Sequence, residues 1–133
     1  MKEPIWLRKD VLLAVHERLL AEHGGSSGIR DEGLLESALG RPQNLLAYGK
    51  PAIFDLASAY ACGIIKSHPF VDGNKRTGFM AAFLFLGINK IDFNAEESDV
   101  VLSTLAVAAN EMNEAAYAEW LEAHSVVPKT RQK

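Results

Sequence analysis

Two long apolar segments constrain the fold of this chain more than any other feature. Residues Ile53 to Ser67 and Lys75 to Leu86 carry apolar side chains around most of a helical circumference. A helix that is apolar on nearly every side is buried in the centre of a protein. The sequence therefore predicts two central helices that other helices cover, with little room for sheet.

Turn signals divide the rest of the chain into shorter helical stretches. Four further helices are predicted, over Lys9 to Glu22, Asp31 to Ala38 with an end at Gly40 and Pro42, Val100 to Asn110 with Ser98 as N-cap, and Glu114 to Ala123. The expected fold class is all-α, a compact bundle of about six helices. A chain of 133 residues at 48% hydrophobic composition can bury one core, so residues 1–125 are predicted to form a single domain and residues 126–133 a flexible C-terminal tail.

One stretch is predicted to depart from helix. Residues 44–49 lie between two prolines, and their leucines and tyrosine are compatible with β-structure beside a glycine. A short β-hairpin around Leu45 to Tyr48 is one interpretation. An ordinary loop whose Leu45 and Tyr48 contact the core is the other.

Charge and cysteine content narrow the class of protein. The net charge of −3 provides no basic surface for nucleic acid, and the one cysteine, Cys62, cannot form a disulfide within the chain. No apolar run reaches membrane-spanning length, so a cytoplasmic protein with no membrane partner is expected.

His16 and His23 lie seven residues apart without an acidic or cysteine partner to complete a metal site, so both are predicted to be surface residues.

The loop between the two central segments holds side chains suited to phosphate. From residue 68 to residue 78 it reads HPFVDGNKRTG. The first amides of a helix have no partner inside it, and the helix dipole adds positive charge, so a helix that starts after Gly73 offers an unobstructed anion site. Arg76 adds a fork of donors that matches phosphate oxygens, Lys75 adds a point charge, and Asn74 can bind a phosphate or cap the helix. The sequence therefore predicts a polyphosphate site.

Two more residues of this loop suit metal binding and proton transfer. Asp72 supplies the hard oxygen ligand that Mg²⁺ prefers when it also contacts phosphates. His68 has an ordinary pKa of about 6.5, which suits it to take a proton from a hydroxyl group near neutral pH. The pair predicts a base and a metal ligand beside the phosphate site.

Each residue of the loop has an ordinary structural explanation when it stands alone. The histidine before the proline is typical of a turn, and the Asp-Gly pair is a common turn pair. The asparagine is an ordinary N-cap, and the two basic residues are an ordinary solvated helix start. The combination of all of them in this order favours the phosphate site.

Residues 68–76 resemble the signature of the Fic/Doc superfamily, and the lysine at position 75 makes the chain similar to its Doc branch. The stretch 28–43 is similar to that branch as well, so the resemblance covers most of residues 5–122. It implies a Fic-like helical bundle with a short β-hairpin flap, formed here by Leu45, Leu46, Ala47 and Tyr48, that aligns the target segment by backbone pairing.

The resemblance also assigns a role to the loop residues. It implies that His68 is the catalytic base, that Phe70 anchors the loop in the core, and that Asp72 binds Mg²⁺. The ATP-binding residues would be Gly73, Asn74, Lys75 and Arg76.

Two positions differ from the relatives that transfer AMP. Those relatives have glycine where this chain has Lys75 and a second arginine where it has Phe79. The lysine intrudes into the pocket that AMP transfer requires, and the phenylalanine cannot hold a γ-phosphate. The similarity to Doc implies a reversed nucleotide, whose γ-phosphate faces His68 and passes to a threonine or serine hydroxyl of a target protein. By similarity that target is translation elongation factor Tu, and protein synthesis stops.

The resemblance further implies the toxin of a toxin–antitoxin pair. Fic enzymes can carry an inhibitory Ser/Thr-x-x-x-Glu-Gly/Asn run, and this sequence has none. Inhibition would then come in trans from a Phd-like antitoxin segment that folds against the toxin. A Fic-type AMP transferase that tolerates Lys75 and a catalytically silent binding or regulatory module are the alternatives.

Overall fold

Helix α3 (Ile53–Ser67) is the buried centre of the fold. In the computed structural model, which describes residues 3–127, ten of its fifteen residues are buried. It packs most extensively against α4 (Asn74–Ile88), and then against α2 (Glu32–Tyr48) and α6 (Glu114–Ala123). The prediction of two central apolar helices is confirmed, because α3 and α4 contribute most of the fully buried side chains.

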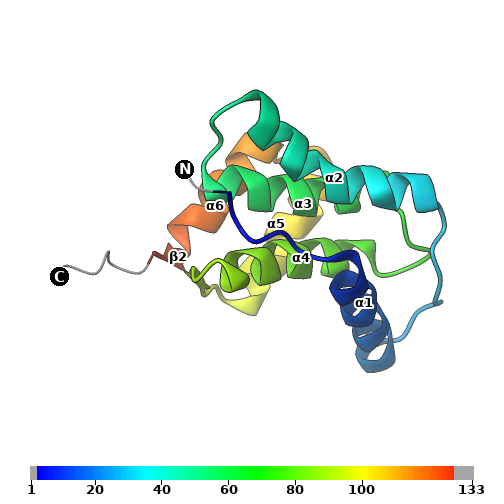
Figure 1. Ribbon diagram of the computed structural model, residues 1–133. Coiled ribbons are helices and arrows are strands. Elements are labelled where there is room, and N and C mark those ends of the chain that lie inside the picture. Colours follow the sequence, from blue (N-terminus) through cyan, green and yellow to red (C-terminus); the bar gives the residue numbers. More distant parts are fainter. Residues whose placement is uncertain (1–2, 128–133) are drawn as a thin grey trace.

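Two further helices and a pair of short strands complete the bundle. Helix α1 (Lys9–His23) packs on α4 at one end of the molecule, and α5 (Glu97–Ala108) contacts α3 and α4 (Figure 1). Strand β1 (Asp92–Phe93) pairs antiparallel with β2 (Ser125–Val126). The predicted all-α bundle of about six helices is confirmed, with a small two-stranded antiparallel sheet, and no described helix is both long enough and apolar enough to cross a membrane.

These two strands are not the hairpin that the sequence predicts, because α5 and α6 lie between them in the chain. Residues 45–48 form the last turn of α2, which continues through Gly40 and Pro42 to Tyr48, so both the predicted helix end and the β-hairpin flap are wrong. Pro42 removes one backbone hydrogen bond of the helix. It is buried all the same, and Leu45 and Leu46 pack against the core. Burial of this apolar face on α3 outweighs the local cost.

The remaining boundaries need smaller corrections. Helix α5 begins at Glu97 with Glu96 as N-cap, so Ser98 lies inside the helix. Helix α6 begins and ends as predicted, and the side chain of its N-cap, Asn113, accepts a hydrogen bond from the Ala116 amide. Val126, which was assigned to the tail, lies in β2, and residues 128–133 lie outside the described part of the chain.

Gly78 sets how closely α4 approaches α3. A Cβ atom at this position would lie 2.6 Å from Cγ1 of Ile65 and 3.0 Å from the carbonyl oxygen of Ala61. We expect Gly78→Ala to lower the free energy of unfolding by about 1–3 kcal/mol, because the added methyl group overpacks the contact.

Gly87 in the same helix provides the matched control. A Cβ atom there would meet nothing within 4 Å. Alanine is the better helix former, so Gly87→Ala is expected to raise the free energy of unfolding by up to about 1 kcal/mol. Urea denaturation measures both changes, and a stabilising Gly78→Ala would show that the two helices can move apart at little cost.

Candidate active site

The loop between α3 and α4 is shaped by hydrogen bonds of its own. Asn74 closes it, because its side-chain oxygen accepts a hydrogen bond from the Phe70 amide and its side-chain nitrogen donates to the Phe70 carbonyl, both at 3.0 Å. Asn74 is buried. Its carboxamide therefore holds the loop and does not cap α4.

Phe70 anchors this loop in the core, and His16 of α1 covers it. The Phe70 side chain is 1% exposed, and its ring stacks on the His16 imidazole with the ring centres 3.8 Å apart. Nε2 of His16 lies 2.8 Å from the carbonyl oxygen of Asp72. Because a carbonyl oxygen only accepts, this contact assigns the proton to Nε2.

The prediction that His16 lies on the surface is wrong, since its side chain is only 2% exposed. Leu12, His16 and Leu20 are the buried residues of α1 and recur every four positions. This spacing was the available signal, because it places His16 on the apolar face of the helix. His23 is exposed, as predicted.

The start of α4 provides unpaired donors for an anion. Its N-cap Gly73 has φ 77° and ψ 19°, a left-handed conformation that glycine adopts without strain. No side chain caps the helix, and the first intrahelical backbone bond runs from the Thr77 amide to the Gly73 carbonyl. Lys75 and Arg76 are exposed in the same turn. Free amides, helix dipole and two cations thus coincide, an arrangement that suits phosphate.

Asp72 lies beside this helix start with an exposed carboxylate. Its Oδ2 accepts a hydrogen bond of 3.0 Å from the Ser26 amide. Within residues 3–127 no group of three or more His, Cys, Asp or Glu side chains is placed to hold a metal ion. A divalent ion at Asp72 would therefore take most of its ligands from phosphates and water, which is how Mg²⁺ is bound beside nucleotides.

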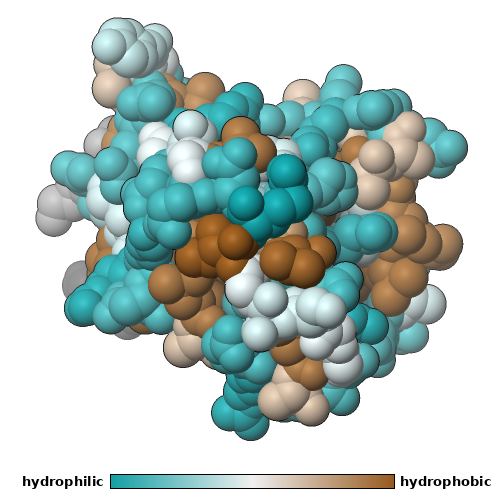
Figure 2. All heavy atoms as spheres, turned by 90° about the vertical axis from the view of Figure 1, so that its right-hand side faces the viewer, coloured by the Kyte–Doolittle hydropathy of each residue, from teal (hydrophilic) through white to brown (hydrophobic). Residues whose placement is uncertain are grey.

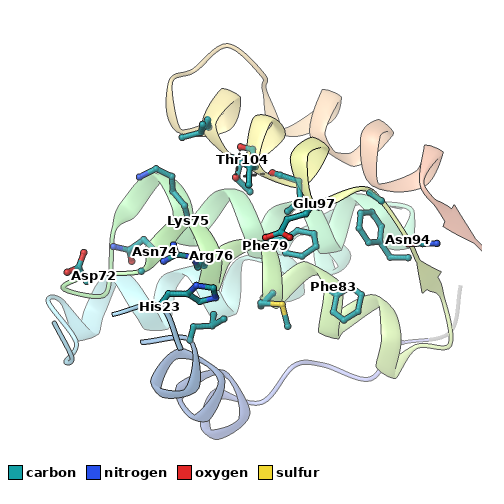
Figure 3. Close-up of a pocket in the computed structure, with 18 residues that line it drawn as sticks. His23, Asp72, Asn74, Lys75, Arg76, Phe79, Phe83, Asn94, Glu97 and Thr104 are labelled. Carbon is teal, nitrogen blue, oxygen red and sulfur yellow. Dashed lines mark hydrogen bonds between the residues drawn. The ribbon is translucent and has the colours of Figure 1, made fainter. Parts of the chain in front are cut away.

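A groove with a volume of about 770 Å³ runs from this loop along α4 (Figure 3). Its polar end is formed by five of the predicted site residues, Asp72, Gly73, Asn74, Lys75 and Arg76. Its floor is apolar, with Phe79, Met80, Phe83 and Phe93. Residues of α5 form one wall, and Leu19 and His23 of α1 form the other. The structure thus places the predicted phosphate ligands at one end of an apolar groove.

Two sets of predicted residues do not line this groove. His68 is exposed at the end of α3, two residues before the buried Phe70. The four predicted flap residues belong to α2, where Leu45 and Tyr48 line a separate shallow groove with Glu36 and Arg41. Residues 45–48 are therefore helical and form no strand with which a target segment could pair beside the loop between α3 and α4.

The segment that does accompany the loop is 25–31, between α1 and α2. The Val71 amide donates to the Gly28 carbonyl at 3.1 Å, and Ile29 forms an antiparallel bridge with Phe70. Figure 2 shows this end of the molecule, where hydrophilic atoms surround small hydrophobic patches. Glycine and serine in residues 24–28 signal a turn, but not the segment with which that turn pairs.

The chemistry of the site does not involve the cysteine. Cys62 is buried in α3 beside Ser58, and burial raises the pKa of its thiol to about 11. The thiol therefore stays protonated near neutral pH, and a protonated thiol is a poor nucleophile.

Comparison with known proteins places this site in a family. The sequence pattern of the Fic/DOC family matches residues 6–86, more than half of the chain. A protein named toxin Doc from Mycolicibacterium smegmatis is 37% identical over 106 residues, which cover 74% of this chain and 78% of that protein. The protein kinase doc of Escherichia phage P1 is 30% identical over 111 residues, covering 83% of this chain and 87% of that protein. The matched region contains α1 to α3, the loop described above and all but the last two residues of α4, and this chain belongs to the Fic/Doc family.

Proposed function

We propose that this protein is a Doc-like toxin that transfers the γ-phosphate of ATP to a threonine or serine hydroxyl of a protein, with elongation factor Tu as the target and arrest of translation as the result. The observation that carries the proposal is that Lys75 and Phe79 both line the groove. The Phe79 ring contacts those of Phe83 and Phe93, with ring centres 5.9 and 5.7 Å away. An aromatic cluster there cannot bind a terminal phosphate, which supports the reversed nucleotide. The name of the phage relative, protein kinase doc, agrees.

Each part of the site has a defined task in this reaction. His68 takes the proton as the hydroxyl oxygen forms its bond to the γ-phosphorus, and the bond to the β–γ bridging oxygen breaks so that ADP leaves. Arg76, Lys75 and the amides at the start of α4 stabilise the charge on the phosphates. Asp72 would hold the Mg²⁺ that neutralises further charge when the nucleotide is bound.

The position of a radioactive label tests the direction of transfer. With Mg²⁺ and purified elongation factor Tu, we expect label at the γ-position of ATP to reach the target and label at the α-position to stay in the nucleotide. Asp72→Ala is expected to lower the rate by at least about 10-fold, because it removes the metal ligand. Transfer of α-label would identify an AMP transferase instead. If ATP were not consumed at all, the protein would be a binding module.

We further propose that a Phd-like antitoxin neutralises the protein by occupying the groove. The groove begins at the cations of α4 and continues as an apolar floor, so it matches an amphipathic segment with acidic residues at one end. Val101 and Leu105 of α5 line it and are 48% and 46% exposed. A partner bound in the groove would cover this apolar surface and block the phosphate site at the same time.

Two leucines of α5 test this surface. Leu105 lines the groove, whereas Leu102 is 66% exposed and does not. We expect Leu105→Glu to weaken antitoxin binding by about 10-fold or more and Leu102→Glu to leave it unchanged, because only the first places a charge in the apolar contact. Titration calorimetry measures both affinities. Equal affinities for the two variants would place the antitoxin elsewhere.

A further inference from the structure

Three successive carbonyl groups at the end of α3 accept hydrogen bonds from Arg30 and Asp31. The Arg30 guanidinium donates from one terminal nitrogen to the Ser67 carbonyl at 2.8 Å and from Nε to the His68 carbonyl at 2.7 Å. The backbone amides of Arg30 and Asp31 both donate to the Pro69 carbonyl, at 2.7 and 3.0 Å. The last carbonyls of a helix have no partner inside it, so the guanidinium satisfies the Ser67 carbonyl at the end of α3, and the other bonds hold the two residues that follow the helix.

The backbone at this point needs such support. His68 has φ 53° and ψ 59°, a left-handed conformation that non-glycine residues rarely adopt. Pro69 follows it, and a residue before proline favours extended backbone. A conformation of this kind persists only where the surroundings impose it. The left-handed backbone of His68 sets the direction in which the imidazole projects from the end of α3.

We infer that Arg30 is a positioning residue that holds the catalytic base His68 in its left-handed conformation. Arg30 is itself placed by the start of α2, where the Asp31 side chain caps the helix by accepting from the Leu34 amide at 3.0 Å. The arginine therefore links the beginning of α2 to the end of α3. This inference rests on the role of His68 in the proposed function.

An arginine suits this position better than a lysine. Two nitrogens of one planar guanidinium donate to the two carbonyls, one nitrogen to each. The rigid guanidinium therefore fixes the orientation of one carbonyl relative to the other and also places a positive charge beside both. A lysine ammonium is a single point of donation on a flexible stem. Arg30→Lys is thus a graded variant that can restore one contact, and Arg30→Met removes both while keeping much of the stem.

Kinetics of phosphate transfer to elongation factor Tu test the inference. We expect Arg30→Met to lower kcat by about 10- to 100-fold, since a misplaced base loses its alignment with the hydroxyl. The KM for ATP should change by less than about 3-fold, because the phosphate-binding groups of α4 are untouched. Arg30→Lys should recover part of kcat. Arg18→Met is the matched control and should leave kcat unchanged, because among residues 3–127 that exposed arginine bonds only Glu22 on the same helix.

A second measurement does not depend on the activity. Backbone chemical shifts of Ser67, His68 and Pro69 report the left-handed turn, and we expect them to move toward extended values in Arg30→Met but not in Arg18→Met. If the wild-type protein transfers no phosphate, the proposed function fails while these shifts still test the role of Arg30. Unchanged His68 shifts in Arg30→Met would overturn the inference. So would a loss of activity that appears in KM with kcat unaltered.

Discussion

Replacing His68 by alanine is expected to lower phosphate transfer by at least about 100-fold, since the hydroxyl then loses its base. His68 is exposed, so the melting temperature should change little. In cells the variant is expected to be harmless, whereas expression of the wild-type chain without its antitoxin should arrest growth. Transfer of γ-label and growth curves measure the two effects.

His23→Ala is the control for this substitution. His23 is also an exposed histidine and lines the groove near the start of α4. No step of the proposed reaction uses its imidazole, so activity and toxicity should be retained. An active His68→Ala protein, or an inactive His23→Ala protein, would assign the proton transfer to a different group.

Phe70→Ala is expected to lower the free energy of unfolding by about 3–5 kcal/mol, the cost of removing a fully buried aromatic side chain. The variant loses its core packing and the stacked contact with His16, whose Nε2 holds the Asp72 carbonyl. We therefore expect the loop to lose its shape as well, so that activity falls below what the fraction of folded protein explains. Urea denaturation gives the stability, and transfer rates per folded molecule give the activity.

Val71→Ala gives a comparison in the same loop. Val71 follows Phe70 directly but is 49% exposed, and its contribution to the hydrogen-bond network comes from its backbone amide. The change in free energy of unfolding should stay within about 0.5 kcal/mol. Equal destabilisation by both substitutions would show that Phe70 is not the residue that anchors the loop.

Local patterns in the sequence were sufficient for the central helices and for the start of α4. Ile53–Ser67 and Glu114–Ala123 have the predicted bounds, because apolar periodicity and short-range turn signals act within a few residues. The free helix start after Gly73 follows from the same kind of information. The Asn74 side chain does not cap this helix and bonds Phe70 instead, because its contacts depend on how the loop closes.

The errors lie where distant segments meet. Pro42 and Gly40 carry strong local signals for a helix end, yet packing of Leu45 and Leu46 on the core keeps α2 helical to Tyr48. His16 is buried because α1 crosses the loop, a contact between residues 56 positions apart. Tertiary burial can exceed a local cost of about 1 kcal/mol for glycine and about 3 kcal/mol for proline inside a helix, which is why propensity alone misplaces such elements.

The sequence by itself determined that this chain forms a helical bundle and that one loop brings His68, Asp72, Lys75 and Arg76 to the start of a helix, because those properties reside in residue types and their spacing. Only the tertiary structure decided what holds that loop. His16 from α1 and Arg30 from the start of α2 reach it across 56 and 38 positions of sequence, and such contacts have no local signature. They exist because burial of the apolar faces of α1 and α2 brings both residues to the end of α3.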